Sequence, residues 1–255
     1  MTGVPSTVNR MDVFDPAVSS TAATLIGVAG LLLFAVTSWR SPRPLPEVYR
    51  PRVAWVLAMQ YFGACLAVAA AANVIGTILT RRPLGDGSFS NTTFTLWFVA
   101  CVIVEVVAYG VIWPMGTLTH GRPRRAGWQL GFGLAWGICE SCLFMSIWAV
   151  SERFIGNRWI AGLVAFTLIS SFIGLWHDKY WDVHIAPEHN IPVWNPRKVF
   201  LCHIPNLCIT LPFLAVYRAP ALFLMFQTIS LTLSVWFMRF PAPDDTTPQP
   251  VIPAV

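Results

Sequence analysis

The sequence predicts an all-α protein, a bundle of seven transmembrane helices, and three observations lead to this fold class. First, 55% of the 255 residues are hydrophobic and only 11% are charged, whereas a soluble domain carries about 25% charged residues. Second, the apolar residues are gathered in seven runs, each near the length of about 20 residues that a helix needs to cross a bilayer. Third, each run is continuously apolar, which favours helices over the alternating strands of a barrel.

The predicted spans follow one another with short polar connections. They cover approximately residues 19–39, 53–79, 92–118, 127–150, 157–176, 198–217 and 220–239. The second and third runs are the longest, so tilted helices are expected there. Residues 1–18 form a polar segment before the membrane domain of residues 19–240. The proline-rich residues 241–255 are typical of a disordered tail.

The basic residues between the runs indicate an orientation. With the N-terminus outside, eleven of the 17 Arg and Lys residues fall on the inner side and six on the outer side. Cytoplasmic loops carry the excess of positive charge. We therefore expect a multi-pass protein of the cell membrane, with its N-terminus outside, its C-terminus in the cytoplasm and the lipid bilayer as its surroundings. Nucleic acid is not expected as a partner, because the basic residues form no patch on a polar domain.

The fourth run contains two GxxxG spacings, Gly127 with Gly131 and Gly133 with Gly137. Glycines four residues apart on a membrane helix allow the backbone of a second helix to approach closely. Packing within one molecule is the more economical interpretation of both pairs. The alternative is a homo-oligomer whose copies meet through this helix.

Two carboxylates, Glu105 and Glu140, fall deep within the predicted spans. A charge at the membrane centre costs about 2.5–3.5 kcal/mol on insertion scales, so each side chain is expected to hold a proton. We interpret both as candidate catalytic residues, since a protonated carboxyl group can act as a general acid. The structural alternative is a neutral glutamate that hydrogen-bonds across a helix contact. Asn206 and Gln227, also in apolar runs, either line a pocket or cross-link helices.

The segment from His177 to His189 gathers three of the five histidines and three of the twelve carboxylates. These side chains bind metal ions and transfer protons near neutral pH. The candidate ligands of a divalent metal are His177, Asp182, His184, Glu188, His189 and His203. Two or three histidines with a carboxylate suffice for such a site. The spacing matches no strong ligand motif, so metal-free acid–base chemistry and a hydrated interfacial loop are open alternatives.

Part of the third run reads Cys-Val-Ile-Val-Glu-Val-Val-Ala-Tyr-Gly-Val-Ile-Trp-Pro, from Cys101 to Pro114. This stretch resembles the acid-bearing helix of the small seven-helix integral membrane terpene cyclases. The resemblance implies that Glu105 protonates an epoxide or an alkene. In that family an Asp on the last helix assists the reaction. The last run here contains no carboxylate, so Glu140 would have to take its place.

These features lead to three hypotheses of function. The first is an intramembrane enzyme that acts on a lipophilic small molecule, such as an isoprenoid, a steroid or another lipid. Its reaction would be acid–base chemistry such as cyclisation or isomerisation, with or without a metal. The second is a proton-coupled transporter in which the two glutamates relay protons. The third is a non-catalytic subunit of a membrane complex, with the histidine-rich segment as its docking surface.

Overall fold

The structure is a computed structural model that describes Phe14 and residues 51–115, 123–176 and 198–245, and every regular element in this part of the chain is a helix. The elements are α2 (Pro51–Ala71), α3 (Val74–Thr80), α4 (Thr92–Glu105), η2 (Val106–Ile112), α5 (Trp113–Met115), α6 (Ala126–Phe154), α7 (Arg158–Trp176), η5 (Val199–His203), α9 (Ile204–Ala215) and α10 (Pro220–Met238). The all-α fold class is thus confirmed for the described residues.

Four of these helical stretches are long and apolar enough to cross a membrane. They are α2, the continuous stretch α4–η2–α5 over Thr92–Met115, α6 and α10. Two shorter apolar stretches, Arg158–Gly174 and Val199–Ala215, lie beside them. The first predicted span, residues 19–39, lies outside the described residues. The described residues therefore form an all-helical bundle with four candidate membrane spans, and the complete seven-span bundle stays a prediction.

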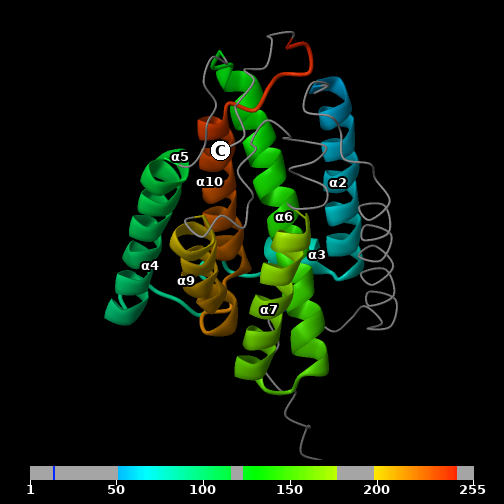
Figure 1. The fold of residues 1–255 in the computed structure, drawn as a ribbon. Helices are drawn as coiled ribbons and strands as arrows, with labels where there is room; N and C mark the ends of the chain where they lie inside the picture. Colours follow the sequence, from blue (N-terminus) through cyan, green and yellow to red (C-terminus); the bar gives the residue numbers. More distant parts are fainter. Residues whose placement is uncertain (1–13, 15–50, 116–122, 177–197, 246–255) are drawn as a thin grey trace, which may run out of the picture.

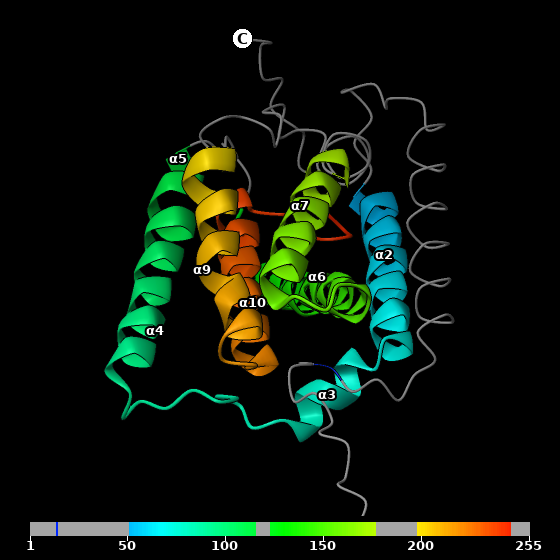
Figure 2. The ribbon, with the colours of Figure 1, turned by 90° about the horizontal axis from the view of Figure 1, so that it is seen from below.

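The long helix α6 forms the centre of the described bundle. It packs against α10, α2 and α7, and these three helices lie around it in Figure 2, where α6 is seen nearly end-on. The helices run alternately in opposite directions, so that the start of α2, the start of α6 and the end of α10 lie at one end (Figure 1). Because α6 is enclosed in this way, polar side chains near its middle are held away from water and lipid.

One of the two GxxxG pairs accounts for the close contact between α6 and α10. A Cβ atom at Gly133 would lie 2.7 Å from the Cα of Thr232, and one at Gly137 would lie 2.6 Å from the Cα of Thr228. This pair therefore packs within the molecule, as the more economical interpretation expects. Gly131, by contrast, has no heavy atom within 4 Å of a built Cβ.

The predicted helix over residues 53–79 is interrupted, and its interpretation as one helix is wrong. Helix α2 ends at Ala71, and α3 begins at Val74 after Asn73, whose φ is 54°. Asn is one of the few residues that adopt the left-handed conformation readily. The carbonyl of Asn73 then accepts a hydrogen bond of 2.8 Å from the Thr77 hydroxyl. A polar residue in an apolar run here marks the end of a helix.

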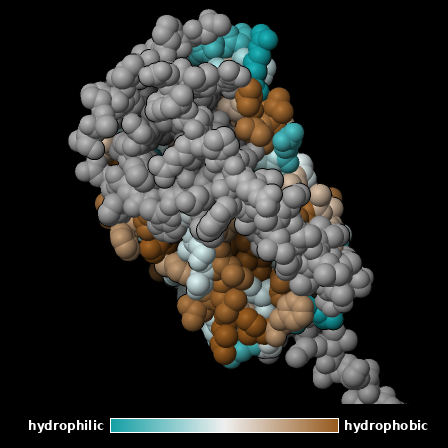
Figure 3. Space-filling view, turned by 45° about the vertical axis from the view of Figure 1, so that its right-hand side comes forward, coloured by the Kyte–Doolittle hydropathy of each residue, from teal (hydrophilic) through white to brown (hydrophobic). Residues whose placement is uncertain are grey.

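The outer face of α4 is suited to contact with lipid. Leu96, Val99, Ile103 and Val107 follow one another at spacings of three or four residues, and all are exposed. Residues at this spacing lie on one face of a helix. Apolar side chains also cover much of the described surface seen in Figure 3. A face of this kind is stable when hydrocarbon surrounds it.

The chain after α10 packs onto the bundle for at least five residues, although the composition predicts disorder from residue 241. The indole Nε1 of Trp55 donates a hydrogen bond of 2.7 Å to the carbonyl of Pro241. Arg125 and Asp244 form an ion pair with a distance of 3.0 Å between Nη1 and Oδ1. The ring of Phe240 stacks on Phe132 with 4.1 Å between centroids. These contacts tie the ordered C-terminal segment to α2 and α6.

Candidate functional site

Two π-helical segments, η2 and η5, shape the candidate site, and each ends shortly before a proline. Pro114 follows η2 and Pro205 follows η5. A proline ring clashes with the carbonyl four residues earlier and cannot donate to it. Those carbonyls belong to Gly110 and Leu201, which lie inside the two π-helical segments. The wider turn is a known response to such a conflict and is frequent at functional sites.

The two π-helical segments pack against each other. The thiol of Cys202 on η5 donates a hydrogen bond of 3.2 Å to the carbonyl of Ala108 on η2. This contact places the aromatic rings of Tyr109, Trp113 and His203 side by side. The His203 ring lies edge-on to Trp113, with 5.4 Å between centroids. The ammonium group of the buried Lys198 lies 4.3 Å from the centre of the same indole.

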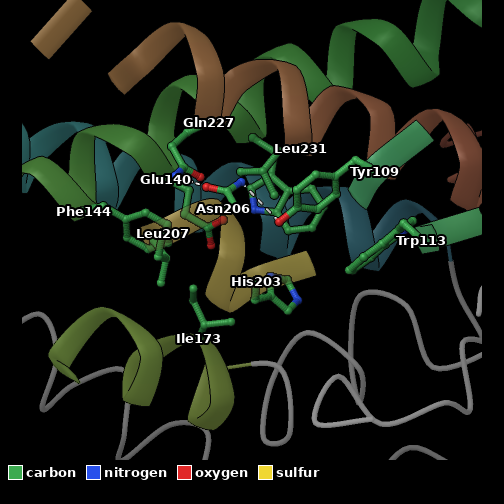
Figure 4. A pocket seen from close by; sticks show the side chains of 11 residues that line it. Tyr109, Trp113, Glu140, Phe144, Ile173, His203, Asn206, Leu207, Gln227 and Leu231 are labelled. Carbon is green, nitrogen blue, oxygen red and sulfur yellow. Dashed lines mark hydrogen bonds between the residues drawn. The ribbon is translucent and has the colours of Figure 1, made fainter. Parts of the chain in front are cut away.

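A small pocket lies where these rings meet the middle of α6 and α10 (Figure 4). Its lining is mainly aromatic and aliphatic with a few polar groups: Tyr109, Trp113, Trp136, Glu140, Phe144, Ile173, His203, Asn206, Leu207, Gln227 and Leu231. The cavity volume is about 20 Å³, which is room for about one water-sized group. An apolar cavity with a few converging polar groups is the usual form of a binding site.

Glu140 is the carboxylate that reaches this pocket. It sits at the midpoint of α6 and is 3% exposed. The hydroxyl of Tyr61, at the midpoint of α2, donates a hydrogen bond of 2.9 Å to Glu140 Oε1. The predicted catalytic residue is thus placed at a pocket, in the enclosed centre of the bundle, with one of its oxygens held by a neighbouring helix.

Glu105, the other predicted catalytic residue, does not line the pocket. It ends α4 and is 2% exposed, and neither of its carboxyl oxygens has a hydrogen-bond partner in the described part of the chain. Ser230 lies within side-chain hydrogen-bonding reach of it, but its hydroxyl donates to the carbonyls of Phe226 and Gln227 in its own helix instead. Tyr109 lies close enough to interact with Glu105 electrostatically. Tyr109 is within electrostatic range of Glu140 as well. The two glutamates therefore occupy one region of the bundle, but only Glu140 can meet a molecule in the pocket.

A polar network centred on Asn206 joins η2, α9 and α10. Asn206 Nδ2 donates to Tyr109 Oη at 3.3 Å and to Ser230 Oγ at 3.0 Å. Gln227 Nε2 donates to Asn206 Oδ1 at 2.6 Å and to Thr210 Oγ1 at 2.8 Å. The sequence left open whether Asn206 and Gln227 line a pocket or cross-link helices, and in the structure they do both.

The predicted metal ligands fall mostly outside the described residues. This holds for His177, Asp182, His184, Glu188 and His189. The sixth, His203, lines the pocket beside Trp113. Within the described ranges, no three His, Cys, Asp or Glu side chains are arranged to hold a metal ion. The metal site therefore stays a prediction.

Sequence reasoning missed the two tyrosines of the site, Tyr61 and Tyr109. Both are buried within helices, Tyr61 at the midpoint of α2 and Tyr109 in η2, whereas Tyr in membrane proteins is enriched at the head-group level. The sequence did contain a signal for these two residues, which is a Tyr in the middle of an apolar run. Its hydroxyl needs a partner when buried, and here the partners are Glu140 and Asn206.

The comparisons with known proteins gave no relatives for this site. No protein-family model matches the chain, and neither a curated protein nor a solved structure is significantly similar to it. The site must therefore be interpreted from its own residues.

Proposed function

We propose that this protein is an intramembrane enzyme that carries out acid–base chemistry on a lipophilic substrate, with Glu140 as the general acid. The observation that carries the proposal is the Glu140 carboxyl group, buried at the midpoint of α6 and lining an aromatic pocket. Ionisation costs most where water is absent, so a proton-carrying Glu140 is the form we expect. Such a group is suited to proton transfer.

The chemistry that suits the pocket is protonation of an alkene or an epoxide. The O–H bond of Glu140 breaks, and its proton bonds either to an alkene carbon, through the electrons of the π bond, or to the epoxide oxygen, whose bond to carbon then breaks. Either step leaves a carbocation. The carboxylate then takes a proton from a neighbouring C–H bond, whose electron pair closes a new double bond. The faces of Trp136 and Phe144 can stabilise positive charge during this step. The products would be isomers of the substrate, and cyclised isomers where a second double bond of the substrate attacks the carbocation before the proton is lost.

The resemblance of Cys101–Pro114 to membrane terpene cyclases supports the same class of reaction, but we assign the acid differently. In that resemblance Glu105 is the acid, whereas Glu140 is the carboxyl group that borders the pocket. The cavity has room for the reacting group only, so the chain of the substrate must extend outward toward lipid. The proposal therefore includes entry of the substrate from the bilayer. It also places the protein in the cell membrane, with its N-terminus outside and its C-terminus in the cytoplasm.

The experiment compares the wild type with Glu140→Gln and with Glu152→Gln as a matched control in the last turns of the same helix. Each protein is expressed in a heterologous host, and lipid extracts are compared by chromatography and mass spectrometry without a chosen target. We expect a product with the mass of a host lipid but a different retention time. It should be present with the wild type and the control, and absent with Glu140→Gln. Equal extracts from all three would contradict the proposal.

A proton-coupled transporter is the second candidate, and one observation favours it. Two buried carboxyl groups, Glu105 and Glu140, both lie within electrostatic range of Tyr109, as expected for a relay within a membrane. Proteoliposomes with a pH-sensitive dye inside separate the two functions. Proton flux that depends on both glutamates, without any altered lipid, would support the transporter and replace the enzyme.

A further inference from the structure

The polar network at the pocket can be counted group by group, because each side chain has a fixed number of donors and acceptors. An amide side chain has two N–H donors and a carbonyl with two lone pairs. Asn206 uses both N–H donors, one to Tyr109 and one to Ser230. Its side-chain carbonyl accepts from Gln227 at 2.6 Å. The Thr210 hydroxyl shares its single proton between the backbone carbonyl of Asn206, at 2.7 Å, and this side-chain carbonyl, at 3.2 Å. Asn206 therefore has no unused N–H donor for a ligand.

Gln227 and Tyr109 each keep one group that is not used. Both N–H donors of Gln227 are spent, on Asn206 and Thr210, but its carbonyl Oε1 accepts no hydrogen bond from the described residues. The Tyr109 hydroxyl accepts from Asn206, but its own O–H donates to no acceptor there. Both residues line the pocket, and Tyr109 is 2% and Gln227 4% exposed. The network thus presents one donor and one acceptor to the cavity.

Unused polar groups at a buried site cost free energy until a ligand or water satisfies them. We infer that the pocket binds the hydroxyl group of a neutral, lipophilic alcohol, which accepts from Tyr109 and donates to Gln227. This inference rests on the proposed function for the nature of the site, and it names the substrate class. A hydroxyl is also the size of one water molecule, which matches a cavity of about 20 Å³.

Other oxygen-containing functional groups fit the Tyr109 donor and the Gln227 acceptor less well. An ether, an epoxide or a ketone can accept from Tyr109 but has no proton for Gln227. A carboxylate or a phosphate also lacks that proton and would bring negative charge beside the Glu140 carboxyl group. A site built to hydrogen-bond a hydroxyl discriminates strongly against analogues that cannot complete both bonds. The alcohol anchored in this way would set which carbon of the substrate meets Glu140.

The test measures binding to the full chain in lipid nanodiscs with two labelled probes, the prenyl alcohol farnesol and the sterol cholesterol. The unlabelled methyl ether of each probe serves as competitor beside the unlabelled alcohol. The variants are Tyr109→Phe and Gln227→Leu. Their matched controls are Tyr217→Phe, in the turn after α9, and Gln60→Leu, on the exposed side of α2. Thermal denaturation of each variant shows whether it is folded.

We expect at least one alcohol to bind the wild type, and its methyl ether to compete about threefold to tenfold more weakly, the effect of one lost hydrogen bond. Tyr109→Phe should weaken the alcohol and the ether alike by a similar factor, since Tyr109 can donate to either oxygen. Gln227→Leu should remove the difference between alcohol and ether. The controls should bind as the wild type does.

Three outcomes would overturn the inference: no binding of either alcohol, equal binding of alcohol and ether by the wild type, or unchanged binding by a folded Tyr109→Phe variant. Glu140→Gln keeps this test separate from the proposed reaction. A variant that binds the alcohol normally while no lipid product depends on Glu140 would reject the enzyme and leave the alcohol site standing.

Discussion

The Tyr61 hydroxyl donates a hydrogen bond of 2.9 Å to Glu140 Oε1, and this bond joins the midpoints of α2 and α6. Both side chains are buried, and they lie 79 residues apart in the sequence. A hydrogen bond of this kind fixes the rotation of the carboxyl group about its own axis. Tyr61 is therefore a positioning residue for Glu140, and it does not itself line the pocket.

Replacing Tyr61 with Phe should slow turnover about tenfold while leaving KM nearly unchanged. The reason is that the substitution removes the hydrogen bond that orients the Glu140 carboxyl group and leaves the pocket lining unaltered. The loss of one buried partner corresponds to about 1–3 kcal/mol. The infrared C=O stretch of Glu140, assigned with Glu140→Gln, should shift in the same variant. Tyr217→Phe is the matched control, and an unshifted band would show that the hydrogen bond has no role in holding the acid.

Glu105→Met should raise the melting temperature of the purified protein. Neither oxygen of Glu105 has a hydrogen-bond partner in the described residues, so its burial is a cost that an apolar side chain of similar length removes. The expected gain is about 1 kcal/mol. Glu140→Met should act in the opposite direction, because Tyr61 loses the acceptor of its hydrogen bond. Thermal denaturation in detergent checks both, and a destabilised Glu105→Met would show that the carboxyl group is structural.

Gly137→Ala should destabilise the bundle by about 1–3 kcal/mol, the usual cost of an overpacked contact. The added methyl group would lie 2.6 Å from the Cα of Thr228 on α10, and a backbone atom cannot move aside as a side chain can. Gly131→Ala is the control on the same helix, since nothing lies within 4 Å of its built Cβ. Equal melting temperatures for the two variants would contradict the close contact of α6 with α10.

Trp55→Phe should lower the free energy of unfolding by about 1 kcal/mol, the value of one hydrogen bond. The indole donates to the carbonyl of Pro241 and holds the chain after α10 against the bundle. Limited proteolysis should then cut near residues 241–245 faster than in the wild type. The control is Trp159→Phe on α7, whose side chain is 60% exposed. Proteolysis at the wild-type rate would mean that the other contacts of this segment suffice to hold it.

The helical character of the chain could be predicted because continuous apolar runs leave few alternatives in a membrane. The ends of helices could be predicted only where a residue type forces the helix to end. The break at Asn73 depends on a left-handed conformation, which Asn can adopt but does not have to adopt. The packing of Gly133 and Gly137 was expected from their spacing. That α10 is the helix they contact depends on the whole bundle.

The candidate site could be predicted only in part. A carboxyl group deep in an apolar run stands out because its insertion into a membrane costs free energy. Both Glu105 and Glu140 could be predicted as candidates for this reason. Which of them borders a pocket depends on the rotation of each helix, and a helix that is apolar on all sides has no periodicity to set that rotation. The roles of Tyr61 and Tyr109 follow from contacts between distant segments, which no local pattern in the sequence records.

Pro205→Ala should reduce turnover and binding at the pocket without lowering the melting temperature. The new N–H can bond to the carbonyl of Leu201, so the π-helical turn over Val199–His203 can contract to a regular α-helical turn. When the turn contracts, it holds one residue fewer, and the residues before it rotate by about 100° around the helix axis. This rotation moves Lys198 away from Trp113. Pro212→Ala, in the interior of α9, is the control because no π-helical segment precedes it. The new amide at position 205 should be protected from hydrogen exchange, because it donates to the Leu201 carbonyl. An unprotected amide at position 205, with unchanged binding, would show that the proline does not set the π-helical turn.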